Sequence, residues 1–123
     1  MIVRYLTGDP PYMAERASQI IDGSVRLILT SLILAETAYV LSSVYAVERP
    51  QLVDALLALI AKQNIELWHM DEASVTEALL LCRGSHRVSF ADALLWVTAR
   101  ASEAPVVYTF DRRFPAQDID LRR

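Results

Sequence analysis

The stretch SFADALLWVTARASEAPVVYTFD, residues 89–111, carries the pattern that decides the fold of this chain. Ser89 can cap a helix that extends to about Ser102, and the dipeptide Ala104-Pro105 ends that helix. The β-branched and aromatic residues 106–109 then predict a strand. A helix that leads directly into an apolar strand is typical of an α/β domain.

The same alternation of helices and strands extends along the rest of the chain. In chain order, the sequence predicts a helix at 11–23, a strand at 25–29, a helix capped by Thr30-Ser31 through about Val47, a helix from Pro50, a strand at 65–68, a helix capped by Asp71 to about Arg83, and a last strand at 119–121. We therefore expect an α/β fold with a mostly parallel central sheet flanked by helices, and ligands at the carboxyl ends of the strands.

Length and composition predict one domain that covers residues 1–123. The chain has 54% apolar residues, enough for a core without disulfides or metals, and its one cysteine, Cys82, excludes an intrachain disulfide. No apolar run approaches the ~20 residues of a membrane helix, and residues 1–4 do not resemble a signal peptide. We expect a cytoplasmic protein with no membrane partner.

The net charge of −3 argues against a nucleic-acid binder that relies on bulk positive charge. The charge is unevenly distributed, however, because residues 83–123 carry 7 basic and 5 acidic side chains, a balance of +2. Of the 12 cations, 11 are arginines, which suit bidentate recognition of phosphate, although the codon composition of a GC-rich genome is a slightly better explanation of them.

Three carboxylates stand in unusual surroundings. Glu36 is the single charged residue from 27 to 47, and Asp92 is the single charged residue from 88 to 99. Asp111 follows an apolar strand directly. A charge inside an apolar stretch is costly to bury unless it is paired or coordinates a metal.

The expected geometry brings the three carboxylates together. Helices that pack on a parallel sheet run antiparallel to its strands, so the first turns that carry Glu36 and Asp92 should lie at the carboxyl edge, beside Asp111. Clustered carboxylates repel one another, and an all-oxygen site favours Mg²⁺ or Mn²⁺. Such an ion activates water for displacement at phosphorus and would let a net-acidic protein hold a phosphodiester.

Each carboxylate also has a plainer explanation. Asp92 could belong to a capping box at the start of its own helix. Glu36 could pair with a buried arginine such as Arg26 or Arg100. Asp111 could simply cap the turn that contains the two arginines after it.

Four segments resemble the PIN-domain family and, in size and layout, the VapC-type toxins of bacterial toxin–antitoxin pairs. They are Val3-Arg4-Tyr5-Leu6-Thr7-Gly8-Asp9-Pro10, Leu34-Ala35-Glu36-Thr37 followed by Val40-Leu41, Phe90-Ala91-Asp92-Ala93-Leu94-Leu95, and Thr109-Phe110-Asp111-Arg112-Arg113-Phe114. Together they span nearly the whole chain, and the last two are the most specific.

The resemblance implies a three-layer PIN-like fold and a metal-dependent endoribonuclease that hydrolyses RNA phosphodiesters, as the toxin of a toxin–antitoxin pair. It places the family's second, third and fourth acidic positions on Glu36, Asp92 and Asp111, and a pocket hydroxyl on Thr109. It also implies a cognate antitoxin that blocks the site, and a homodimer. Three arginines near the same edge are candidates to hold RNA phosphates: Arg87, Arg112 and Arg113.

The chain departs from the family pattern at its start. The family begins with a central strand that ends in an acidic motif, and here both the strand and the first acidic ligand are absent. By this alignment residues 2–6 form the first helix, whereas their propensity alone favours a strand. Either the natural start lies upstream, or this is a degenerate member that binds RNA or an antitoxin-like partner without efficient cleavage. A plainer third hypothesis is an interaction domain whose acids only pair with arginines.

Overall fold

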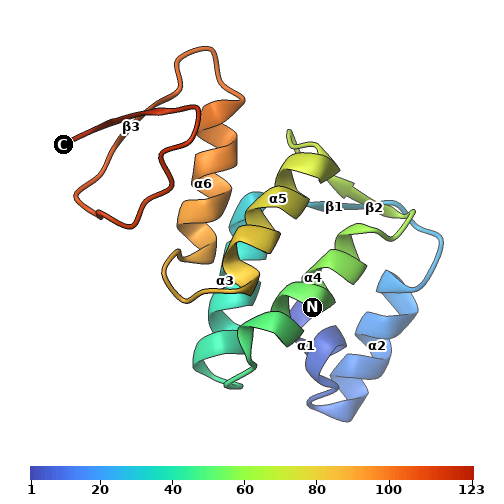
Figure 1. Ribbon diagram of the computed structural model, residues 1–123. Coiled ribbons are helices and arrows are strands. Elements are labelled where there is room, and N and C mark those ends of the chain that lie inside the picture. The colour runs from blue at the N-terminus through green and yellow to red at the C-terminus, as the bar shows by residue number, and fades with distance from the viewer.

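A computed structural model describes all 123 residues as six helices and four short strands (Figure 1). In chain order the elements are α1 (Ile2–Thr7), α2 (Pro11–Ile21), β1 (Leu27–Leu29), α3 (Ser31–Ser43), α4 (Arg49–Ile60), β2 (Ile65–Leu67), α5 (Glu72–Arg83), α6 (Phe90–Arg100), β3 (Val106–Tyr108) and β4 (Asp120–Arg122). Every helix and strand expected from the sequence is present. The prediction that α3 continues to Val47 was wrong, because Ala46 adopts φ 52°, outside the helical region.

Residues 2–6 form a helix, as the family alignment implied, and not the strand that their propensity favoured. The helix ends at Gly8, which has φ 73° and donates its N–H to the main-chain O of Arg4 at 2.9 Å. A left-handed glycine is the common way to end a helix. α1 packs on α2, so tertiary contacts outweigh the β propensity of Ile2 and Val3.

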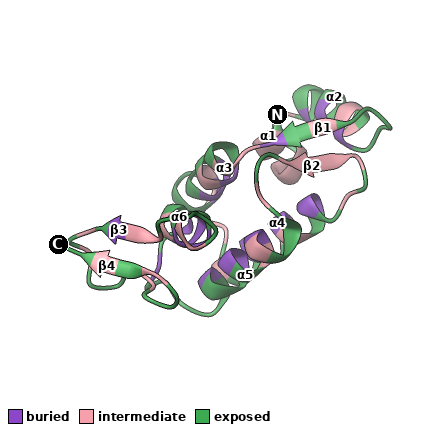
Figure 2. Ribbon diagram, turned by 90° about the horizontal axis from the view of Figure 1, so that it is seen from above, coloured by how far each residue is buried: buried purple, intermediate pink, exposed green.

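The strands pair in parallel, as expected for an α/β fold, but they form two separate pairs. β1 pairs with β2 in the register Leu27–Ile65, and β3 pairs with β4 in the register Val106–Asp120. No ladder joins the two pairs into one central sheet. Both views show the pairs at opposite ends of the molecule, with α3 to α6 between them (Figures 1 and 2).

β1 and β3 each have one strand neighbour and one free edge. The N–H of Leu27 and the C=O of Leu29 bond to the β2 segment, so the main-chain groups of Ile28 point away from it. Thr109, which follows β3, donates its N–H to the main-chain O of Arg122 in β4. The main-chain groups of Tyr108 therefore point away from β4. The side chains of Ile28 and Tyr108 are 57% and 69% exposed, so the sheet faces they occupy are open to solvent.

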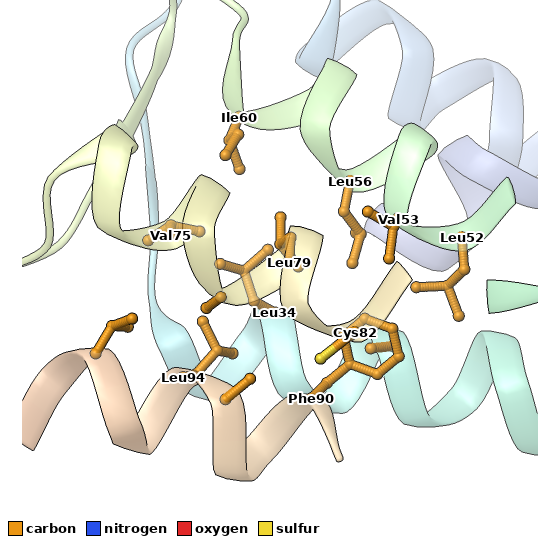
Figure 3. Packing of buried hydrophobic residues seen from close by; sticks show 14 of the residues in the cluster. Leu34, Leu52, Val53, Leu56, Ile60, Val75, Leu79, Cys82, Phe90 and Leu94 are labelled. Carbon is orange, nitrogen blue, oxygen red and sulfur yellow. The ribbon is translucent and has the colours of Figure 1, made fainter. Parts of the chain in front are cut away.

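The core lies among the helices. Twenty-two buried residues form one cluster, and α3, α4, α5 and α6 each contribute several of them (Figure 2). Figure 3 shows Leu34, Leu79 and Leu94 converging from α3, α5 and α6, with Phe90 beside Cys82. Close packing of this kind fixes the helices relative to one another, including the two that carry Glu36 and Asp92.

Side-chain caps fix where three of the helices begin, as the sequence predicted. Thr30 Oγ1 accepts from the N–H of Ile33 at 3.3 Å at the start of α3. Asp71 caps α5 in the same way, and Ser89 Oγ accepts from the N–H of Asp92 at 3.1 Å at the start of α6. Each cap satisfies a main-chain donor that the helix leaves free. No helix of the chain is both long and apolar enough to cross a membrane.

Candidate active site

Glu36 lies in the second turn of α3, on the face of the helix that meets solvent. The expectation that it sits in an apolar interior was wrong, because this face also exposes Leu32 and Tyr39, so α3 is apolar on its outer side as well. The alternative that Glu36 pairs with a buried arginine is also wrong. Arg26 pairs with Glu66 at 2.6 Å and Arg100 pairs with Glu77, and the Glu36 carboxylate makes no ion pair.

Asp92 lies half-buried in the first turn of α6. Its main-chain N–H is bound by Ser89, which confirms half of the predicted capping box, but its carboxylate makes no side-chain hydrogen bond or ion pair. A carboxylate near a helix N-terminus is favoured by the helix dipole. Asp92 is therefore an acid at a helix N-terminus that pairs with no cation of the chain.

Asp111 is the one candidate acid that the chain itself engages. Its Oδ1 accepts from the main-chain N of Arg113 at 2.8 Å and from Nε of Arg113 at 3.3 Å. These bonds, the main-chain one first, hold the pKa of Asp111 below its ordinary value. Thr109 Oγ1 accepts from the N–H of Asp111 at 3.0 Å, so this hydroxyl orders the turn that follows β3. The alternative that Asp111 caps this turn is confirmed, because Asp111 accepts from the main-chain N–H of Arg113 within the turn.

The three carboxylates do not form a preformed metal site. No group of three or more His, Cys, Asp or Glu side chains lies close enough together in the chain to hold a metal ion. The expected convergence of Glu36, Asp92 and Asp111 assumed one sheet with one carboxyl edge. Because β1 and β3 belong to separate sheets, the segments that follow them do not share an edge.

The candidate RNA-binding arginines differ in whether their guanidinium groups are bound to other residues of the chain. Arg87 and Arg112 are exposed, and their guanidinium groups make no hydrogen bond or ion pair within the chain. Arg113 is exposed but bonds to Asp111. Arg87 lies in the loop before α6, five residues ahead of Asp92, so a free cation and a free acid occupy the same end of that helix.

Sequence reasoning missed Arg49, which lies at the start of α4. Its Nη1 donates to the main-chain oxygens of Val88 at 2.6 Å, Ser85 at 3.0 Å and Cys82 at 3.4 Å. A cation in the first turn of a helix opposes the helix dipole. A positive charge at this unfavourable position was the one feature of the sequence that indicated a role for Arg49 in tertiary contacts.

A comparison with models of protein families tests the resemblance that the four sequence segments indicated. A model described as "PIN domain" matches residues 1–119 of the 123-residue chain. The chain belongs to the PIN domain family. No curated protein and no solved structure matches it significantly. The match covers both acid-bearing helices and the Asp111 turn, so all three candidate acids lie inside the PIN domain.

Membership gives the protein a nuclease-type function that acts on nucleic acid, because PIN domains are generally nucleases that use divalent metal ions. The hypothesis of an interaction domain whose acids only pair with arginines does not hold for two of the three candidate acids. Glu36 and Asp92 of this PIN domain have no arginine partner, and only Asp111 has one.

Proposed function

We propose that this PIN domain is a metal-dependent endoribonuclease that hydrolyses RNA phosphodiesters. The observation that supports the proposal is the pair of unneutralised carboxylates, Glu36 on α3 and Asp92 on α6, on two helices that pack against each other. The half-buried Asp92 carboxylate is partly desolvated without a partner, and a cation that binds it would relieve that cost. We assign Mg²⁺ or Mn²⁺ as the cofactor, because oxygen ligands suit these ions.

Each candidate residue has a role in this proposal. We assign Glu36, Asp92 and Asp111 as the catalytic and metal-binding acids. Thr109 orders the turn that carries Asp111. Exposed arginines hold the flanking phosphates of the RNA, as charged side chains do in nucleic-acid complexes. These are Arg87, Arg112 and Arg113.

The proposal is tested by cleavage of a single-stranded RNA library with Mg²⁺ or Mn²⁺ and again after chelation. We expect cleavage that requires the metal and that Asp92→Asn abolishes. Asn keeps the size of the side chain, and the cap from Ser89 to the main-chain N–H of residue 92 is unaffected.

The matched control is Glu103→Gln, which removes one exposed acid from the loop after α6 and should leave cleavage unchanged. Full activity in Asp92→Asn contradicts the site assignment. Cleavage that persists after chelation contradicts the metal requirement.

We further propose that the protein is the toxin of a toxin–antitoxin pair, acts in the cytoplasm as a homodimer, and is held inactive by a cognate antitoxin. These statements rest on the resemblance to VapC-type toxins. A small gene that overlaps the coding sequence upstream would support the pairing. Growth arrest on expression, relieved by Asp92→Asn, tests the toxin role, and light scattering of the purified protein tests the dimer.

The second candidate function is a PIN domain that binds RNA or an antitoxin-like partner without efficient cleavage. The observation that favours it is the separation of the three acids, together with the engagement of Asp111 by Arg113. It predicts RNA binding without turnover. RNA cleavage that requires Mg²⁺ or Mn²⁺ would contradict it.

A further inference from the structure

Arg49 connects α4 to the segment that leads into α6. Its Nη1 bonds to three main-chain oxygens, at 2.6 Å for Val88, 3.0 Å for Ser85 and 3.4 Å for Cys82. The guanidinium carbon lies 4.8 Å from the ring centroid of Phe90, close enough for a cation–π contact. Arg49 makes no ion pair with any carboxylate, so these neutral groups are its partners.

Residues 84–88, which include two of the carbonyls that Arg49 binds, make few other hydrogen bonds. None of the main-chain hydrogen bonds in turns and loops involves residues 84–88, and Gly84 makes no capping bond at the end of α5. The side chain of Ser85 bonds only to the N–H of Arg87, at 3.0 Å. The carbonyls of Ser85 and Val88 are therefore fixed by Arg49, and hydrogen bonds to a charged group are stronger than neutral ones.

Asp92 lies four residues after this segment, in the first turn of α6. Val88 is bound through its carbonyl, Ser89 caps α6 by accepting from the N–H of Asp92, and Phe90 is buried against the core. The position of the α6 N-terminus, and with it the Asp92 carboxylate, is thus set by a cation that lies 43 positions earlier in the chain.

Arg49 also lies beside the helix that carries Glu36. A hollow of about 160 Å³ between α3 and the start of α6 is lined by Arg49 together with Ala35, Ala38, Ser89, Phe90 and Ala91. Ala35 precedes Glu36 and Ala91 precedes Asp92 in the chain. Arg49 therefore lines the same hollow as the residues that directly precede the two unpartnered acids.

We propose that Arg49 is a positioning residue, which holds residues 84–90 and thereby sets the position of Asp92 relative to Glu36. The proposal rests on the proposed function, because it assigns Asp92 to the reaction. Arg49 does not contact RNA in this role. Its effect on cleavage passes through the main chain at Val88 and Ser89.

The first test measures amide hydrogen exchange by NMR, which needs neither metal nor RNA. In Arg49→Gln we expect exchange of the Asp92 amide to rise by about tenfold or more, since hydrogen bonds to a charged group are lost. Arg49→Lys keeps one cationic donor and should give an intermediate rise. The control is Arg83→Gln, whose guanidinium bonds to Asp54 at 3.0 Å and not to the loop.

An unchanged exchange rate at Asp92 in Arg49→Gln overturns the proposal. A rise spread evenly over α2 to α5 also overturns it, because that result reports general loss of stability. If the wild-type protein cleaves no RNA, the proposed function fails, and exchange at Asp92 still decides whether Arg49 orders this segment.

The second test separates positioning from RNA binding by kinetics. With saturating Mn²⁺, Arg49→Gln should lower kcat by about 100-fold per folded molecule, the scale expected for a misplaced catalytic group, with KM unchanged. Arg49→Lys should restore part of kcat. A raised KM with unchanged kcat would assign Arg49 to RNA binding and overturn the positioning role.

Discussion

Asp111 and Arg113 form a closed local pair, in which the Asp111 Oδ1 accepts from both the main-chain N and the Nε of Arg113, at 2.8 Å and 3.3 Å. Two residues apart, they fold the end of the β3 segment into a turn that Thr109 supports. A residue proposed to bind RNA thus occupies an acid proposed to bind metal, so both proposed roles require this ion pair to open. Binding of RNA to Arg113 would leave Asp111 with the main-chain donor alone.

Removing the Arg113 side chain should release Asp111 in part. In Arg113→Ala we expect the pKa of Asp111 to rise toward its ordinary value but to stay below it, because the main-chain hydrogen bond is the larger cause of the shift and survives. Carboxyl carbon NMR shifts followed across the acid range measure this pKa. Arg112→Ala is the control and should leave it unchanged; equal shifts in both variants would show that general charge and not the pair lowers the pKa.

Asp22 ties three helices together at one end of the molecule. Its Oδ1 accepts from Lys62 Nζ at 2.8 Å, just after α4, and from Tyr5 Oη at 2.6 Å on α1. Lys62 first and Tyr5 second lower the pKa of Asp22. A lowered folded-state pKa contributes stability above the unfolded-state value, and that stability is lost as pH falls through the folded-state value.

The variant Asp22→Asn should therefore flatten the loss of stability on the acid side. We expect its free energy of unfolding to be lower than that of the wild type at pH 7, and the difference to shrink below the ordinary aspartate pKa of 3.8. Urea unfolding at neutral and acid pH measures both. Glu15→Gln, an exposed acid on α2, should keep the wild-type slope. A difference for Asp22→Asn that is constant with pH would contradict the ion pair.

The core among α3 to α6 should be sensitive to cavities. Leu56 on α4 is 0% exposed, and Leu56→Ala should lower the free energy of unfolding by about 2–5 kcal/mol. Leu80 on α5 is 50% exposed, and Leu80→Ala should change it by roughly 0.5 kcal/mol or less. Chemical unfolding followed by circular dichroism compares them, and equal losses would place Leu56 outside the core.

The cap of α6 should contribute measurably to stability. Ser89→Ala removes the acceptor for the Asp92 N–H and should cost about 1 kcal/mol. Ser89→Asp supplies another good cap and should retain most of the wild-type stability. Thermal unfolding of the two variants measures the difference. If the alanine and aspartate variants have the same unfolding temperature, the cap at Ser89 is not the stabilising interaction.

Local patterns in the sequence predicted the elements of this PIN domain well. The caps at Thr30, Asp71 and Ser89 depend on residues three positions apart, so they follow from the sequence without knowledge of the fold. The motifs around Asp92 and Asp111 were enough to indicate the family that the comparison then showed. The helical state of residues 2–6 came from that resemblance, since local propensity pointed to a strand.

The sequence by itself thus determined the order of helices and strands and indicated the family, because both depend on short-range patterns. Tertiary structure alone decided that the strands form two pairs, that Glu36 and Asp92 stay unpaired, and that Arg49 reaches the loop before α6. These outcomes depend on which distant segments pack together. That choice is made by the free energy of the whole core and by which main-chain donors and acceptors find partners, and no local pattern of residues encodes it.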